Sequence, residues 1–263
     1  MKKSFLSVML AVGVFSVGGA EAQITLLHTF EGVVSPGGVL VDSGGNYYGA
    51  VTVGSVTSTD FNGYYNITRY DTYPYTSQLR FYNEDFSIRA LVNINGYVSS
   101  VSCISEKIFN TDGKLEFIVT SRGSEGYGDF VRLYDENGNV LQNFATVGTA
   151  LGAGLHLTSG GNYRLHVIRQ NDDYKSYTDI YSLPGKKEVS VLPQPKRETR
   201  ALAYKLKEGE TATMKIYNIK GQVVDTKLID HTFNKILLNT ARYPRGTYIY
   251  KINDKNAKKF TLK

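Results

Sequence analysis

The sequence contains no tryptophan, four histidines and a single cysteine, Cys103, among its 263 residues. One cysteine cannot form a disulfide within the chain. Cys103 lies in the alternating segment VSSVSCIS, and no histidine lies within fifty residues of it on either side. We therefore interpret it as a small buried residue of a strand, since a thiol nucleophile needs a base, which only the fold could then bring close.

Sustained helical periodicity is also missing. Beyond residue 22 no segment repeats its apolar residues at a helical period with capping residues, and none approaches the roughly 20 apolar residues of a membrane-spanning helix. The chain has 20 tyrosines and 26 glycines, and Val, Ile and Thr recur in short alternating runs broken by Gly, Asn and Asp. This pattern predicts an all-β protein without an integral membrane segment in the mature chain.

Motifs for catalysis are absent as well. The chain has no Gly-x-Ser-x-Gly element, and its Ser- and Gly-rich turns lack the lysine of a phosphate loop. Asp135, Asn137 and Asn139 have the spacing that opens a calcium loop, but no glutamate closes it, so we interpret the segment as a hairpin turn. The segment that runs from Asn110 to Glu116 is interpreted in the same way.

Two histidines flank a turn at residues 159–163. In the simplest register His156 and His166 would lie opposite each other across the hairpin, but a metal site needs a third ligand and none is evident nearby. We expect no metal, no cofactor and no catalytic residues, and hence no enzyme. The alternative is a small extracellular hydrolase that uses this histidine pair or carboxylates brought together by the fold.

The N-terminal segment has the order of a secretory signal peptide. Lys2 and Lys3 precede an apolar run over residues 5–17, and the small residues Ala20 and Ala22 follow. We predict cleavage between Ala22 and Gln23, which gives a signal peptide at residues 1–22. A membrane anchor is disfavoured because the run is short and interrupted by glycine.

Charge divides the chain at one point. Residues 196–263 hold 16 Lys or Arg and 6 Asp or Glu, whereas residues 1–195 hold 14 and 18. The lysines of the tail are spread along alternating segments, which indicates the solvated face of a sheet and not a nucleic-acid site. Between the two regions the sequence LPQPKRETR contains two prolines and a run of charge, so we predict a linker at residues 193–200, with few contacts crossing it.

Residues 23–192 contain a blade-like repeat. Tyr82, Tyr134 and Tyr181 each lie in an aromatic strand followed by a turn, with Gly138 and Gly185 four residues after the last two, and the tyrosines are spaced by 52 and 47 residues. Such a spacing is typical of a four-stranded blade. Three units are too few for a closed propeller, so a packed β-meander is favoured over a fourth blade completed by the N-terminal strand.

Residues 201–263 form a series of short strands and turns. The series includes the strand-turn-strand IYNIKGQVV, with Tyr217 and Gly221, the turn Gly246-Thr247-Tyr248 that leads into a strand, and a final lysine-bearing strand that ends at Lys263. Alternating apolar residues in each strand predict a small β-sandwich.

This series closely resembles the C-terminal sorting domain of type IX (Por) secretion cargo of Bacteroidota. The resemblance covers about the last 65 residues and implies an immunoglobulin-like sandwich. It implies further that the type IX machinery carries the chain from the periplasm to the outer-membrane surface or the medium, and that a surface sortase-like peptidase then removes the tail. For the motif residues Tyr217, Gly221, Gly246, Tyr248 and Lys263 it implies a role in export, through the fold that the machinery reads.

A tyrosine cluster gives the only functional lead in residues 23–192. Its members lie in the irregular segment around Pro74 and are Tyr64, Tyr65, Tyr70, Tyr73 and Tyr75. Aromatic faces on a rigid sheet stack on sugar rings or anchor a protein. We therefore expect a binding or adhesion module for a glycan or a surface protein; a tyrosine-rich strand without a ligand, in a purely structural envelope protein, is the alternative.

Overall fold

The computed structural model describes residues 24–31, 55–56, 61, 63–70, 74–110, 112–121, 130–144, 149–157, 162–171, 173–186 and 199–263. Almost all regular structure in these ranges is β-strand, with one short 3-10 helix, η1 (Thr240–Arg242), which confirms the all-β prediction. No helix in this part of the chain has the length and apolarity needed to cross a membrane. The predicted cleavage site at Ala20, Ala22 and Gln23 lies outside the described residues, as do Tyr73 and the linker residues 193–198.

In the described residues, twelve strands precede the linker, in three antiparallel sheets. The first sheet has the order β3 (Tyr64–Tyr70), β4 (Thr76–Tyr82), β5 (Ile88–Asn95). The second has the order β6 (Val98–Ser105), β7 (Glu116–Ser121), β8 (Phe130–Asp135), β9 (Val140–Asn143). The third has the order β1 (Thr25–Glu31), β12 (Ser176–Lys186), β11 (Asn162–Gln170), β10 (Thr149–Leu157), β2 (Ser55–Val56).

Strands β7 and β8 of the second sheet are buried on both faces. Every residue of β7 is buried, and successive side chains of a strand point to opposite faces. Phe117 and Val119 pack in a core shared with the first sheet, whereas Ile118 packs in a core shared with the third. The sequence EFIVTS therefore shows no polar alternation, as expected of a strand between two layers.

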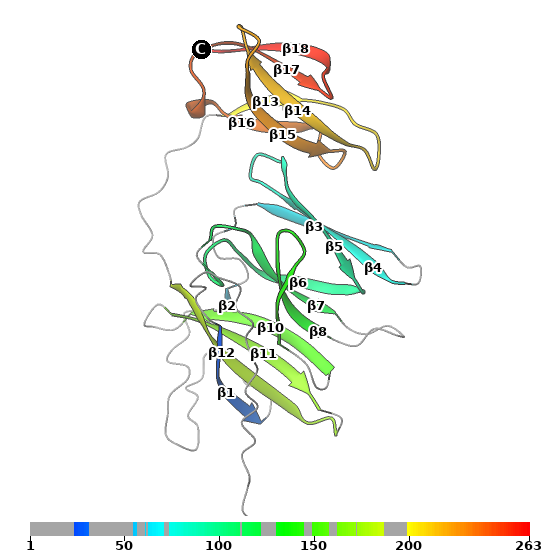
Figure 1. The fold of residues 1–263 in the computed structure, drawn as a ribbon, viewed down its shortest axis with the longest axis vertical. Helices are drawn as coiled ribbons and strands as arrows, with labels where there is room; N and C mark the ends of the chain where they lie inside the picture. Colours follow the sequence, from blue (N-terminus) through cyan, green and yellow to red (C-terminus); the bar gives the residue numbers. More distant parts are fainter. Residues whose placement is uncertain are drawn as a thin grey trace, which may run out of the picture.

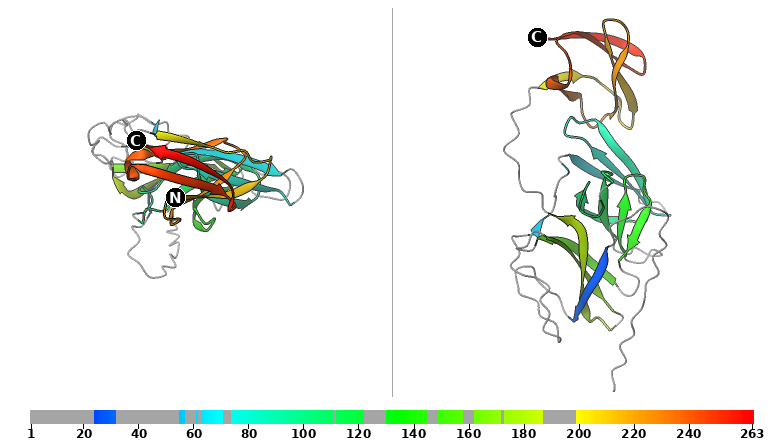
Figure 2. Two further views of the ribbon diagram at one scale, coloured as in Figure 1. Left: turned by 90° about the horizontal axis from the view of Figure 1, so that it is seen from above. Right: turned by 60° about the vertical axis from the view of Figure 1, so that its left-hand side comes forward.

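Three layers thus follow one another along the molecule, and a C-terminal unit lies at the end beside the first sheet (Figures 1 and 2). Strand β5 shows strict alternation of buried and exposed residues, because only one face of the first sheet packs on the second. Cys103 is buried in the core between the second and third sheets, as predicted, and burial raises the pKa of its thiol to about 12.

The predicted turn after Tyr181 is wrong. Strand β12 continues through Gly185 to Lys186, whereas Gly138 does lie in a turn, with φ +88°. Gly185 has a different task, since its N–H donates to the carbonyl of Ile108 at 2.9 Å. A Cβ atom there would lie 2.5 Å from the Cα of Ile108, so the glycine permits a close approach of two backbones.

The C-terminal unit contains two sheets around one core. One sheet pairs β13 (Thr199–Ala203) with β16 (Lys235–Asn239), and the other has the order β15 (Val223–Asp230), β14 (Thr211–Asn218), β17 (Gly246–Ile252), β18 (Lys255–Leu262). Leu202 and Ile236 from the first of these sheets share a cluster with Met214 and Tyr250 from the second. The alternation read in the sequence therefore corresponds to one buried face on each sheet.

Contacts cross between this unit and the first sheet. The backbone N–H of Leu237 donates to the carbonyl of Asp85 at 3.0 Å, and the Tyr82 hydroxyl donates to the Asp230 carboxylate at 2.8 Å. These contacts join the unit to the first sheet at a place away from the predicted linker. They could not be predicted from the sequence, because the residues that pair lie far apart along the chain.

We predict that Gly185→Ala destabilises the protein by about 1–3 kcal/mol, because the added methyl must push two backbones apart. Gly152→Ala, in strand β10 of the same sheet, is the matched control, since a Cβ at Gly152 would meet nothing within 4 Å. Chemical denaturation of the two variants checks this. Equal stabilities would show that the backbone contact at Ile108 relaxes without cost.

Candidate functional site

Strand β3, at the edge of the first sheet, carries three of the five predicted tyrosines. Tyr64, Tyr65 and Tyr70 are 50%, 44% and 44% exposed, and Tyr75 is half-buried just before β4. Tyr64 and Tyr65 are consecutive and point to opposite faces, and Tyr64 and Tyr70 lie about 20 Å apart along the strand. The structure therefore spreads these tyrosines along an edge and does not gather them into one cluster.

The inner face of β3 is fixed to the second sheet. The Tyr65 hydroxyl donates to the carbonyl of Val101 at 3.4 Å, and the Arg69 guanidinium donates to the carbonyl oxygens of Val98 at 2.7 Å and Ser99 at 3.3 Å. The same guanidinium lies 5.3 Å from the centre of the Tyr97 ring. These contacts hold the edge strand in place, and they leave Tyr64 and Tyr70 on the outer face.

The outer face of the first sheet is polar and lies opposite its core face. Cross-strand pairing aligns three rows on it: Asn66–Arg80–Leu91, Thr68–Gln78–Asn93 and Tyr70–Thr76–Asn95. The Gln78 amide donates to the Asn93 side chain at 3.1 Å, and Arg80 donates to Gln78 at 2.9 Å. Amide groups thus form a connected layer, with the exposed ring of Tyr70 at one end.

This polar layer was not predicted from the sequence. Gln78, Arg80, Asn93 and Asn95 alternate with buried apolar residues in TSQLRFY and IRALVNIN, so each is placed on the outer face by strand periodicity. The signal was present in the alternation, but the pairing that aligns the two strands cannot be obtained from either strand alone. The Asn66 side-chain oxygen on this face is buried without a hydrogen-bond partner.

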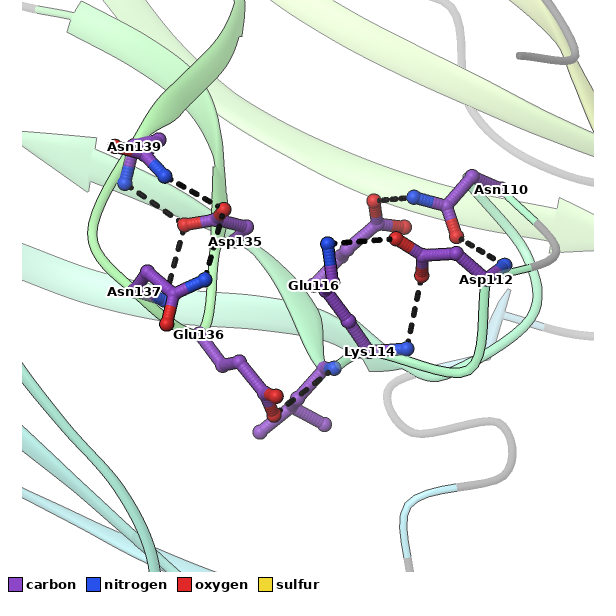
Figure 3. Close-up of polar contacts among 9 residues, drawn as sticks. Asn110, Asp112, Lys114, Glu116, Asp135, Glu136, Asn137 and Asn139 are labelled. Atoms are coloured by element: carbon purple, nitrogen blue, oxygen red, sulfur yellow. Dashed lines mark hydrogen bonds and ion pairs between the residues drawn. The ribbon is translucent and has the colours of Figure 1, made fainter. Parts of the chain in front are cut away.

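The two acidic turns lie side by side at the ends of β7 and β8 (Figure 3). The Asp135 carboxylate accepts from the backbone N–H groups of Asn137 at 3.0 Å and Asn139 at 2.8 Å, and from the Asn139 amide at 2.9 Å. Burial opposes its ionisation, but these donors outweigh burial and lower the pKa of Asp135. Its lone pairs are used by the hairpin turn, as predicted.

The turn before β7 is organised in the same way (Figure 3). The Asn110 side chain accepts from the N–H of Asp112 at 3.0 Å and donates to the Glu116 carboxylate, and Asp112 accepts from the N–H of Lys114 at 2.8 Å. No group of three or more potential metal ligands occurs in the part of the chain that the structure describes. The geometry of both acidic segments is therefore that of turns.

The histidine pair lies on β10 and β11, on the face of the third sheet away from the second. The predicted register is wrong by two residues: His156 pairs with Arg164, and His166 with Gly154, because the hairpin is centred on residue 160. The two imidazoles are diagonal neighbours with centroids 4.0 Å apart. They are only 6% and 7% exposed, and the Nδ1 atom of each has no hydrogen-bond partner.

Burial keeps these histidines neutral. It lowers the pKa of His156, and it lowers that of His166 to about 3, with further contributions from the charges of His156 and Arg164. The unfolded chain binds a proton at His166 below its ordinary pKa of 6.5, whereas the folded chain does so only near pH 3. The free energy of unfolding must therefore fall as the pH decreases from 6.5 towards 3.

The predicted tail residues occupy different positions in the C-terminal unit. Tyr248 is buried and donates to the carbonyl of Pro244 at 2.7 Å, and Tyr217 donates to the Asp254 carboxylate at 2.9 Å. Gly221 and Gly246 have φ of +78° and +153°, in the region that favours glycine. Lys263 is exposed at the end of β18.

A pocket of about 280 Å³ adjoins Tyr248. It is lined by Val224, Asp225, Arg242, Tyr243, Pro244 and Tyr248. The Tyr243 hydroxyl donates to the Asp225 carboxylate in it, and burial, together with this carboxylate, raises the pKa of Tyr243. The pocket thus has an apolar wall of aromatic rings. It also contains one acidic and one basic side chain, Asp225 and Arg242.

We predict that His166→Leu flattens the pH dependence of stability. At pH 5 the wild-type protein should have lost about 2 kcal/mol relative to pH 7 through His166, and the variant should not lose this part. Urea denaturation at pH 7, 6 and 5 measures it, with His156→Leu as the comparison that removes the pH dependence contributed by the other buried histidine. Parallel curves for wild type and His166→Leu would show that His166 titrates in the folded protein as it does in the unfolded chain.

Comparison with known proteins assigns the C-terminal unit. Residues 190–263 match the family model of the secretion system C-terminal sorting domain, which spans the described strands β13 to β18. No curated protein and no solved structure matches the chain. The resemblance inferred from Tyr217, Gly221, Gly246, Tyr248 and Lys263 is thus confirmed for this unit. The chain carries a type IX secretion sorting domain at residues 190–263 and is a cargo of that system, exported to the cell surface or the medium.

Proposed function

We propose that residues 23–192 form a non-enzymatic binding or adhesion module that acts at the cell surface or in the medium and binds a glycan on the outer face of the first sheet. The observation that carries the proposal is the polar layer of that face, in which Gln78, Asn93 and Asn95 share one sheet face with the exposed ring of Tyr70. Export of the chain by the type IX system supports it, since the module then meets extracellular glycans or surface proteins.

The chemistry of this face suits a sugar. Amide side chains donate and accept at once, and they match the vicinal hydroxyl groups of a pyranose, while a tyrosine ring stacks on its apolar face. The side chains stand on paired strands, so their positions are fixed before binding and little conformational entropy is lost. Gln78 is further oriented by Asn93 and Arg80.

The export route is proposed in two steps. The signal peptide at residues 1–22 would carry the chain across the inner membrane, and the sorting domain would direct the crossing of the outer membrane. A surface sortase-like peptidase would then separate the sorting domain from the module, within or near residues 187–198. The sorting domain is basic, with 16 Lys or Arg from residue 196 onward, and these residues are proposed to serve export and not nucleic-acid binding.

We predict that Tyr70→Ala combined with Asn93→Ala weakens glycan binding at least tenfold and leaves the melting temperature nearly unchanged, because both side chains are exposed on a sheet face. Tyr174→Ala is the matched control, since Tyr174 is 83% exposed in the turn that connects β11 and β12. A glycan array followed by titration measures binding. If the wild-type chain binds neither a glycan nor a surface protein in a pull-down, a purely structural envelope role replaces the proposal.

We predict that grafting residues 190–263 onto a passive periplasmic reporter brings the reporter to the surface of a host with type IX machinery. Gly246→Val in the graft should retain the reporter in the periplasm, because a β-branched residue resists a φ of +153°. Thr247→Val, one residue on, is the control. Fractionation and surface proteolysis decide the outcome, and a Gly246→Val graft that is exported as well as the control would remove this turn from the export signal.

A further inference from the structure

An aromatic group joins the sorting domain to the first sheet. Phe233, in the turn between β15 and β16, stacks on Phe86 with the ring centroids 4.5 Å apart and the planes at 13°. Tyr82 meets the same ring edge-on at 5.0 Å, and Tyr64 lies at 6.2 Å. The sorting domain thus inserts one ring among three rings of the first sheet.

The turn that presents Phe86 is well defined. Phe86 has φ +70°, and its N–H donates to the carbonyl of Asn83 at 2.9 Å. The N–H of Asn83 donates to the carbonyl of Ser87 at 2.8 Å, and the Asp85 carboxylate accepts from the N–H of Ser87 at 2.9 Å. The first sheet therefore holds this ring at its end independently of the sorting domain.

Polar groups flank the ring stack on both sides. Asp230 is 1% exposed, accepts from the Tyr82 hydroxyl at 2.8 Å and lies 3.7 Å from the Arg80 guanidinium. Lys227 lies 3.0 Å from the Asp85 carboxylate. The contact is therefore charge-paired, and an apolar surface without these partners would leave Asp230 buried and unpaired.

The ionisation states of Asp85 and Tyr82 fit this pairing. Burial opposes the charge of Asp85, but the hydrogen bonds from Ser87 and Lys227 outweigh it and lower the pKa of Asp85. Burial raises the pKa of Tyr82, and the neighbouring Asp230 raises it further, so the phenol stays a hydrogen-bond donor. Lys227 also lies 3.7 Å from Asp225, which lines the pocket beside Tyr248, so an ionic chain runs from the first sheet into that pocket.

The three contacting side chains follow a simple pattern. Lys227, Asp230 and Phe233 are spaced by three residues, and each meets its own partner on the first sheet: Asp85, the Arg80–Tyr82 pair and Phe86. The first sheet thus offers, in this order, the anion Asp85, the donors Arg80 and Tyr82, and the ring of Phe86. Such a surface recognises a short segment that carries a cation, a carboxylate and an aromatic ring in the same order. This surface of the first sheet would lie exposed on a chain without the sorting domain, and exposed patches of this kind mark interaction sites.

We propose that Tyr64, Arg80, Tyr82, Asp85 and Phe86 form a peptide-docking site, which the sorting domain of the same chain occupies with Lys227, Asp230 and Phe233. The partner that fits the vacated site is a protein segment of the pattern Lys-x-x-Asp-x-x-Phe. This site goes beyond the proposed glycan face, because it is centred on the opposite end of β3 from Tyr70 and takes a peptide. The attached sorting domain keeps it closed, since a tethered ligand acts at an effective concentration in the millimolar range.

The test uses the full chain and a fluorescein-labelled synthetic peptide with the sequence of residues 226–236. The wild-type chain should not bind the peptide at micromolar concentration, because its own Phe233 occupies the site. Phe233→Ala should open the site and increase the affinity at least tenfold. The double variant Phe86→Ala with Phe233→Ala should abolish binding, which places the peptide on the first sheet. Fluorescence anisotropy measures all three.

Controls separate docking from folding and from glycan binding. Ile219→Ala removes an exposed apolar side chain at the other end of β15 and should leave the site closed, and a peptide with the same composition in scrambled order should bind no variant. If Phe233→Ala does not fold, Lys227→Ala opens the site in its place. Equal binding to wild type and opened chain, or no binding to the opened chain, overturns the proposal. Phe86→Ala should leave glycan binding at Tyr70 unchanged, so the two proposals fail independently.

Discussion

Burial of strands β7 and β8 of the second sheet on both faces is the constraint on which the arrangement of this protein depends. A strand such as β7, in which every side chain is buried, is stable only if both neighbouring layers are present. Phe117 and Val119 require the first sheet, and Ile118 requires the third. Each outer sheet then has one face in a core with the second sheet and a second face that points away from it, and on the first sheet this second face carries exposed side chains.

The two sheet faces that point away from the second sheet, one on the first sheet and one on the third, carry different kinds of side chain. On the third sheet, the face away from the second carries the buried pair His156 and His166, whose neutral state is maintained by burial. On the first sheet, the free face carries amides, an arginine and exposed tyrosines. Polar side chains on a rigid exposed sheet can meet a ligand without rearrangement, whereas a buried histidine pair contributes mainly to the pH dependence of stability.

Sequence periodicity predicted the strands but not their neighbours. Alternation in KIYN and TYIYKIN predicted the buried faces of the C-terminal unit, and the burial of Cys103 followed from the alternation around it. The positions of His156 and His166 were wrong by two residues, because one residue's difference in the centre of a turn moves every pair in the hairpin by two. Tyr64 and Tyr70 lie close in sequence yet about 20 Å apart in the strand, since an extended chain separates what a loop would gather.

Contacts between the sorting domain and the first sheet were beyond prediction for a similar reason. The pair Phe86 and Phe233 is separated by 147 residues, and neither lies in a strand whose period would point to a partner. A proline-bearing linker indicates freedom between domains, but freedom of the connecting chain does not exclude a specific contact elsewhere.

Opposite charges favour this contact. The region up to residue 195 has four more acidic than basic residues, and the region from residue 196 has ten more basic than acidic. Lys227 and Asp85 form an ion pair of these opposite charges, beside the stacked rings of Phe86 and Phe233. The sorting domain and the first sheet thus form one joined surface. In it, Lys227 pairs with both Asp225 of the pocket and Asp85 of the first sheet. Separation of the sorting domain from the first sheet would therefore have to break the Lys227–Asp85 pair and part the stacked rings of Phe86 and Phe233.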